Sequence, residues 1–149
     1  MNETEQHREL RELIRQFERK TGALHDSEMS CCAITLAQCH ALVEIGRAKH
    51  ISLVELSDVL GLENSTMSRT VNHLVNAEMV KRETDAEDRR YITICLTEDG
   101  QKIFDGIEAS MNLYYKQVLQ RIPKEKHTEV LESLQLLLDA FDTLEQEQS

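Results

Sequence analysis

The chain has 149 residues, the length of one ordinary domain or one multi-helix unit. Apolar residues make up 40% and charged residues 30%, so the chain can bury a core and is not disordered as a whole. Five glycines and one proline exclude collagen-like sequence and favour helices. No apolar stretch approaches the roughly 20 residues of a membrane span.

The net charge is −10, and the acidity is concentrated toward the C-terminus. Residues 97–149 hold eleven acidic and five basic residues, whereas residues 62–96 hold six and five. This balance excludes a strongly basic nucleic-acid coat protein. An aromatic content of 4% without Trp argues against a protein that binds single strands by base stacking. The charge balance is compatible with a local contact between the protein and duplex DNA. We expect that contact in the middle of the chain.

The N-terminal segment is polar and has the apolar spacing of a helix from Leu10 to Phe17. We therefore predict a helix over 5–22, ended by Thr21 and Gly22, and a loop over 23–34. A polar start is not a secretory signal, so we expect a cytoplasmic protein. In that compartment the four cysteines are expected to be reduced thiols rather than a disulfide framework.

Three helices are predicted in the middle of the chain. Thr35 followed by Gln38 has the form of a capping box and begins the first helix. Ser52 begins a short helix, which Gly61 ends, and residues 62–65 lead into the third. Two short helices joined by a few residues around a glycine are typical of a helix-turn-helix.

A β-hairpin is predicted next. Residues 79–83 and 91–96 are rich in β-forming side chains, and a charged turn over 84–90 separates them. A helix-turn-helix followed by such a hairpin is a winged helix. We expect a mainly α fold with a small β-hairpin wing, in which residues 35–97 form the DNA-binding part.

Two long helices are predicted after the wing. Thr97 caps the first, and Pro123 suits the first turn of the second. Apolar residues of the last helix recur at spacings of 4, 3, 4 and 3: Val130, Leu134, Leu137, Phe141 and Leu144. This seam is longer than a small winged helix needs for its own core. Residues 1–34 and 98–149 are therefore expected to form a helical dimerisation part within a single 1–149 unit.

The wing and the third helix carry motifs that resemble the MarR family of winged-helix transcriptional regulators. Asp85-Ala86-Glu87-Asp88-Arg89-Arg90 followed by Leu96-Thr97-Glu98-Asp99-Gly100 is similar to the D-x-x-D-R-R…L-T-x-x-G signature of the family. Ser65-Thr66-Met67-Ser68-Arg69 is similar to the start of its recognition helix. One departure is Glu78, which stands where the family usually has a glycine before the first strand and which tolerates a positive φ less well.

The order of elements and the resemblance together assign a DNA-contact set. Ser65, Thr66 and Ser68 are expected to hydrogen-bond phosphates or bases, and Arg69 to bind a guanine or clamp a phosphate. Further along that helix, Asn72 and His73 are expected near the backbone. On the wing, Arg89 and Arg90 suit a narrow minor groove. Asp88 is expected to pair with an arginine and to order the wing.

Three thiols are the candidate signal site. Cys31 and Cys32 come just before the second helix, and Cys39 lies within it. Such thiols suit a soft metal or metalloid such as Cu(I), Zn(II) or As(III), or a disulfide formed on oxidation. A pocket for an organic ligand stays an equal alternative, and no cofactor is required. We interpret Cys95, in the second strand, as structural.

The sequence thus predicts a dimeric transcriptional repressor that a thiol-reactive, metal or small-molecule signal releases from a pseudo-palindromic operator. An alternative is a winged-helix module that binds another protein without DNA. An enzyme is not expected, since the chain lacks a phosphate-binding glycine loop and a nucleophile elbow.

Overall fold

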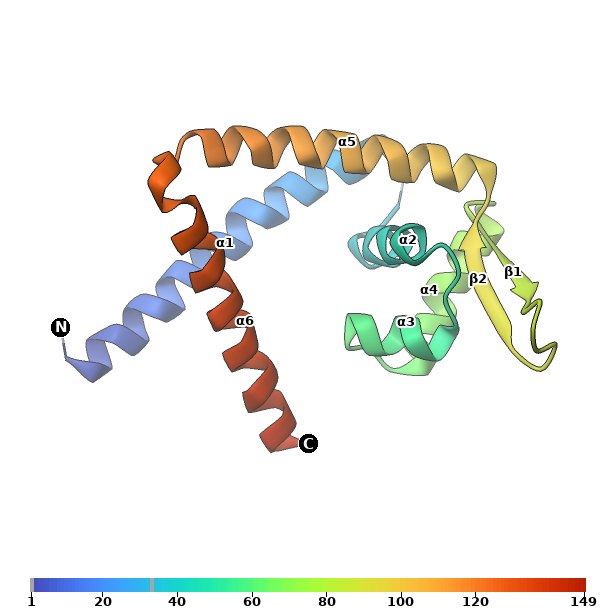
Figure 1. Ribbon diagram of the computed structural model, residues 1–149, viewed down its shortest axis with the longest axis horizontal. Helices are drawn as coiled ribbons and strands as arrows, with labels where there is room; N and C mark the ends of the chain where they lie inside the picture. The colour runs from blue at the N-terminus through green and yellow to red at the C-terminus, as the bar shows by residue number, and fades with distance from the viewer. Residues whose placement is uncertain (1, 33) are drawn as a thin grey trace. The chain divides into compact units, whose positions relative to one another are not determined.

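The computed structural model describes residues 2–32 and 34–149, with side chains described for 2–24 and 34–149. The chain divides into two compact units, Met1–Ile107 and Glu108–Ser149. Its elements in order are α1 (Glu3–Cys32), α2 (Leu36–Ala48), α3 (Leu53–Leu60), α4 (Asn64–Asn76), β1 (Val80–Thr84), β2 (Ile92–Leu96), α5 (Glu98–Gln120), the 3-10 turn η1 (Lys124–Lys126) and α6 (His127–Gln148) (Figure 1).

The predicted winged helix is confirmed within the first unit. Helices α2, α3 and α4 pack on one another, and the hairpin of β1 and β2 lies against α2 and α4 (Figure 1). The fully buried side chains come from all of these elements except β2: Leu42, Ile45, Leu56, Met67, Val71, Leu74 and Val80. Each such side chain contributes roughly 1.5–3 kcal/mol on burial. Helix α4 is therefore held by the same core that holds the hairpin.

The helix ends follow the capping residues. The Thr35 side chain accepts from the Gln38 amide while the Gln38 side chain accepts from the Thr35 amide, so the predicted capping box is confirmed. Ser52 accepts from the Glu55 amide at the start of α3. Gly61 ends α3 with a φ of 64°, a conformation that glycine adopts at little cost. The turn between α3 and α4 therefore begins at Gly61.

The hairpin is antiparallel, with Val80 opposite Leu96 and Thr84 opposite Ile92. Both predicted strands are confirmed, with starts shifted by one residue. A further bridge was not predicted: the amides and carbonyls of Ile51 and Ile94 bond each other at 3.1 and 2.7 Å. The segment between α2 and α3 is thereby attached to the outer edge of β2.

The prediction for the N-terminal helix was wrong at its C-terminal end. Helix α1 does not stop at Thr21 and Gly22 but continues to Cys32. The Thr21 hydroxyl donates to the Phe17 carbonyl, as in an uninterrupted helix. A glycine costs a helix only about 1 kcal/mol relative to alanine, so it ends a helix only when the following residues also leave it. The predicted loop over 23–34 therefore shrinks, and α2 begins at Leu36.

The start of α5 closes against the turn that precedes β1. The Thr97 hydroxyl accepts from the Gly100 amide and donates to the Glu78 carbonyl, at 3.0 and 2.6 Å. Glu78 has a φ of 61°, the positive value that its place before the strand required. An added Cβ on Gly100 would stand 1.8 Å from the Met79 carbonyl oxygen. The L-T-x-x-G motif is therefore a cap and a close backbone approach.

The second unit contains the end of α5, η1 and α6. Pro123 lies just before η1 rather than in the first turn of α6, so the predicted start of the last helix was four residues early. No residue of α6 is buried, although this helix carries several large apolar side chains. Among residues 2–32 and 34–149, no helix has both the length and the apolar character needed to cross a membrane.

Candidate nucleic-acid interface

Helix α4 has one buried side and one open side. Met67, Val71 and Leu74 point into the core and leave the opposite side to solvent. Four of the predicted contact residues are exposed there: Ser65, Arg69, Asn72 and His73. Thr66 and Ser68 are half-buried at the margin of the same side. Because residues three and four apart share a helix face, Ser65, Arg69 and Asn72 form one row.

Asn72 connects this row to the wing. Its side-chain oxygen accepts a hydrogen bond from the guanidinium of Arg82, which lies on β1. Both residues are exposed, so a second guanidinium is held beside the open side of α4. The exposed polar row of α4 is therefore joined to β1 of the hairpin.

Arg82 was not among the predicted contact residues, although the alternation of side chains along the strand indicated it. Alternate residues of a strand share a face, so Arg82 lies on the same side of β1 as the buried Val80. Since Val80 packs in the core shared with α4, an arginine two residues further along must lie at the edge of that helix. The period-two pattern of the strand therefore places this cation next to the recognition helix.

The wing loop is ordered by two aspartates. The Asp85 carboxylate accepts from the amides of Glu87 and Asp88 at 2.8 and 3.4 Å. The Asp88 carboxylate accepts from the Arg90 amide at 3.1 Å and pairs with its guanidinium at 2.8 Å. Side-chain bonds of this kind to nearby amides stabilise tight turns. Asp85 was quoted in the motif but was not assigned a role.

The ion pair between Asp88 and Arg90 also shifts the pKa of both side chains. The Arg90 guanidinium and amide hold the pKa of the Asp88 carboxyl below its ordinary value. The same carboxylate raises the pKa of Arg90. Both groups therefore keep their charges at neutral pH, and the loop keeps its shape.

The two adjacent arginines of the wing differ in their hydrogen bonding. The Arg90 side chain is 85% exposed, yet its guanidinium already binds Asp88. Arg89 is also exposed, and within the described part of the chain no side-chain hydrogen bond or ion pair holds it. Arg89 is therefore the wing cation that is free to meet a phosphate or a groove, whereas Arg90 orients the loop that presents it.

The three candidate signal cysteines are divided between two helices. Cys31 and Cys32 are the last residues of α1 rather than part of a loop, and their side chains lie outside the described residues. Cys39 is buried in α2, and α1 packs against α2. Whether the three thiols approach one another stays a prediction.

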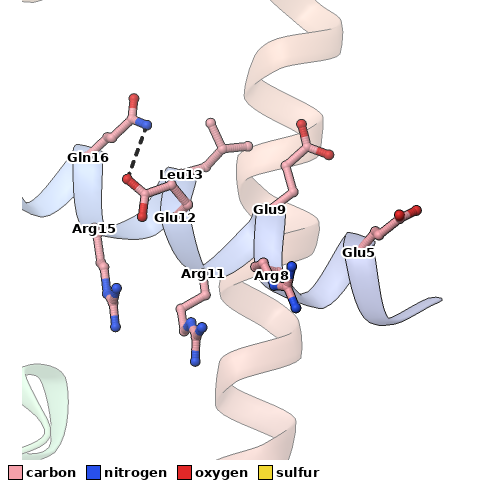
Figure 2. Close-up of a pocket in the computed structure, with 8 residues that line it drawn as sticks. All are labelled: Glu5, Arg8, Glu9, Arg11, Glu12, Leu13, Arg15 and Gln16. Carbon is pink, nitrogen blue, oxygen red and sulfur yellow. Dashed lines mark hydrogen bonds between the residues drawn. The ribbon is translucent and has the colours of Figure 1, made fainter. Parts of the chain in front are cut away.

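The first half of α1 presents a second charged surface. Arg8, Arg11 and Arg15 extend from one side of the helix, while Glu9 and Leu13 extend from another (Figure 2). Leu10, Leu13 and Phe17 are all about half exposed, at 45%, 49% and 53%. A half-exposed apolar row is typical of a helix that packs against a partner, and the row of arginines lies on another side of the same helix (Figure 2).

Comparisons with known proteins agree with this architecture. A model of the MarR family matches residues 34–92, which span α2 to the start of β2. An HTH-type transcriptional regulator, YfiV of Bacillus subtilis strain 168, whose name calls it uncharacterized, is 26% identical over 121 residues. That alignment covers 81% of this chain and 76% of YfiV.

Two solved structures extend the similarity to nearly the whole chain. Streptococcus pneumoniae FabT, solved in complex with DNA, has a TM-score of 0.80 and 17% identity, covering 93% of this chain and 99% of its own. The reduced form of MarR from E. coli has a TM-score of 0.64 and 29% identity, with coverages of 89% and 95%. The similarity to FabT is therefore one of fold.

Proposed function

Because this chain belongs to the MarR family of transcriptional regulators, we propose that it is a homodimeric repressor that binds a pseudo-palindromic DNA duplex. The observation that carries the proposal is the exposed row on α4, which the hydrogen bond between Asn72 and Arg82 joins to the wing. It is a continuous polar edge with cations at both ends, in a chain whose net charge is −10.

Each part of this edge suits one groove of the duplex. An α-helix fits the major groove with its N-terminal residues against the bases, which assigns Ser65, Thr66, Ser68 and Arg69 to that groove. Asn72, His73 and Arg82 then face the backbone, where phosphate contacts fix the register. Arg89 on the wing meets the adjacent minor groove, whose negative potential favours arginine. FabT, which shares this fold, was crystallised with DNA.

The dimer is supported by the apolar side chains that the two units leave uncovered. On α6, Leu134 is 37% exposed, Phe141 44% and Leu144 51%, at the spacing of a helical seam. Exposed apolar area of this extent on a helix marks an interaction surface. The occupant we propose is a second copy, because α6 is acidic while α1 presents a row of arginines (Figure 2). A two-fold dimer places two recognition helices about one DNA turn apart.

We further propose that a signal at Cys31, Cys32 and Cys39 releases the repressor from DNA inside the cytoplasm. The end of α1 and the start of α2 connect the dimerising helix to the DNA-binding core, so a change there can alter the spacing of the recognition helices. Oxidation or a soft metal would act through the thiols. An organic ligand would act by binding between the same helices.

A gel-shift titration against the DNA upstream of the gene for this protein tests the proposal. We expect Arg69→Ala and Arg89→Ala each to weaken binding at least tenfold and to leave the dimer intact. The salt dependence separates their roles, since a lost phosphate contact lowers the slope of log K against log salt by about 0.9. Lys116→Ala is the matched control, because it removes one exposed cation from α5 outside the interface.

The same titration is then repeated with reduced and oxidised protein, and with Cu(I), Zn(II) or As(III). We expect release by one of these treatments, and resistance to it in one of Cys31→Ser, Cys32→Ser and Cys39→Ser. Indifference of the wild type to all treatments would rule out the thiol signal but not DNA binding. Absence of any shift, or equal affinity of both arginine variants and the wild type, would contradict the repressor proposal itself.

A further inference from the structure

Three potential metal ligands meet at the base of the wing. The ligand atoms of His50, Glu83 and Cys95 all lie within 4.8 Å of one another. They belong to neither the DNA-contact set nor the thiols near the end of α1. Cys95, which the sequence pattern placed as a structural residue, is the buried member of this group.

The topology of the hairpin explains why these residues meet. Lys81 and Cys95 are directly opposite each other in the antiparallel pair, so their side chains share one face. Glu83 lies two residues after Lys81 and therefore on that face as well. His50 precedes Ile51, whose backbone bonds to Ile94 next to Cys95. Three separate segments thus contribute one ligand each.

The three ligand residues differ in their exposure to solvent. Cys95 is only 6% exposed, Glu83 is half-buried and His50 is exposed. Together they line a pocket of about 220 Å³, which Gly46 and Gln101 also border. An ion can therefore enter past His50 and reach the thiol at the inner end.

A cation already occupies the neighbourhood of the carboxylate. The Lys81 ammonium lies 3.0 Å from a Glu83 oxygen, and this pairing lowers the pKa of Glu83. Burial, with the nearby Glu83 carboxylate, raises the pKa of the Cys95 thiol. The metal-free thiol is thus protonated and unreactive near neutral pH. A divalent ion would supply the second positive charge that a thiolate and a carboxylate together require.

We propose that His50, Glu83 and Cys95 bind one divalent transition-metal ion of the zinc class. Imidazole, thiolate and carboxylate are the ligands that Zn²⁺ and Co²⁺ accept in tetrahedral sites, and three of them leave the fourth position to water. On binding, Cys95 releases its proton to solvent and Glu83 exchanges Lys81 for the metal.

The geometry requires a small contraction. Ligand atoms of a tetrahedral zinc site are about 3.5 Å apart, given bond lengths of about 2.0 to 2.3 Å. Because the three ligand atoms already lie within 4.8 Å of one another, the contraction is at most about 1.3 Å, and the exposed side chain of His50 can supply it by rotation. The bound ion links the segment between α2 and α3 to both strands of the wing, so it restrains the hairpin against the core.

Cobalt titration of the reduced, purified full-length protein tests the site directly. We expect one equivalent of Co(II) per chain, with the near-ultraviolet charge-transfer band of a cobalt–thiolate bond, and displacement by Zn(II). Cys95→Ser should lose the band. His50→Gln, which changes an exposed residue and spares the fold, should lower the affinity at least tenfold. Hydrogen exchange of residues 80–84 and 92–96 should slow when the ion binds.

Matched controls separate this site from other histidines and thiols. His7→Gln removes an exposed histidine of α1, and Cys39→Ser removes a buried cysteine of α2; both should bind cobalt as the wild type does. The variant with Cys31→Ser and Cys32→Ser should keep the band. The measurement needs no DNA, and in the background of Cys31→Ser and Cys32→Ser the proposed signal site lacks two of its three thiols, so the result obtained there is independent of the proposed function.

Three results would overturn the site. One is the absence of stoichiometric Co(II) or Zn(II) binding at micromolar metal. Another, measured in the background of Cys31→Ser and Cys32→Ser, is a thiolate band that is absent, or that persists when Cys95→Ser is added. The last is wild-type affinity in His50→Gln.

Discussion

Gly100 lies where the first turn of α5 crosses the backbone of Met79. A Cβ at this glycine would stand 1.8 Å from a carbonyl oxygen that cannot rotate away, because that oxygen also accepts from the Thr97 amide. Relief therefore requires α5 or the turn before β1 to shift. The glycine is needed for a close backbone approach rather than for an unusual φ.

We therefore expect Gly100→Ala to lower the free energy of unfolding by about 2–3 kcal/mol, the cost of forcing a group into a filled site. Gly106→Ala is the matched control in the same helix, since nothing lies within 4 Å of its added Cβ. It should stabilise the protein by about 0.5–1 kcal/mol through helix propensity. Urea denaturation of both variants measures the difference, and similar stabilities would contradict the packing argument.

Individual residues also show which features of the structure can be predicted from sequence. The motif identified Thr97 as a helix cap, and Glu78 was recognised as unsuited to the positive φ that the structure gives it. By contrast, the approach of His50 to Glu83 and Cys95 brings together residues of different elements. Such contacts depend on the register of β1 and β2 and on the bridge at Ile51, which no local pattern specifies.

At the scale of elements, the core winged helix was predictable because several local signals agreed. Capping residues, helical spacing and strand alternation each specified the same boundaries, and the structure confirms them within about one residue. The end of α1 was missed because its signal was a single glycine, which costs too little to stop a helix. The start of α6 was misplaced because Pro123 suits the position just before a 3-10 turn equally well.

The wing loop should lose its order in acid, and the direction follows from Asp88. Its pKa is held below the ordinary value of about 3.9, so the folded loop favours the ionised carboxyl. The stabilisation is complete above the ordinary value and is lost as pH falls through the lower folded value. We expect the Arg90 amide signal, measured by NMR, to change in that window and not at higher pH.

Asp88→Asn is the control for this titration. It keeps an oxygen that can accept from the Arg90 amide but removes the titrating charge, so the wing signals should no longer change in that window. A transition of the wild-type loop centred above the ordinary value would contradict the assigned pKa direction. A variant that titrates like the wild type would assign the change to another carboxyl.

At the scale of the whole molecule, most of the acidic residues and the proposed DNA-contact residues lie in different parts of the sequence. The acidic residues are concentrated in the last third of the chain, away in sequence from the row on α4 and the wing. Remote acidity weakens non-specific attraction to DNA, so affinity depends on the local contacts and on the number of recognition helices engaged. The dimer is therefore a condition for tight binding under the proposed function, and the seam on α6 becomes the decisive surface.

Leu134 and Phe141 lie on this seam, two turns apart, whereas Leu136 lies on the other side of the helix and is 70% exposed. In a two-fold dimer each substitution is present on both subunits of the interface. Each buried apolar side chain contributes roughly 1.5–3 kcal/mol to dimer stability. Leu134→Glu or Phe141→Glu should therefore cost at least about 3 kcal/mol of dimer stability, which is roughly a 100-fold rise in the dissociation constant.

Sedimentation velocity should find wild type and Leu136→Glu at twice the chain mass of 17.2 kDa. Both seam variants should shift toward the monomer and lose operator affinity in parallel, although every DNA-contact residue is intact. If the seam variants stay dimeric while Leu136→Glu dissociates, the opposite side of α6 forms the interface. If all three stay dimeric, α6 does not hold the dimer, and the arginine row of α1 has to meet a different surface of the second copy.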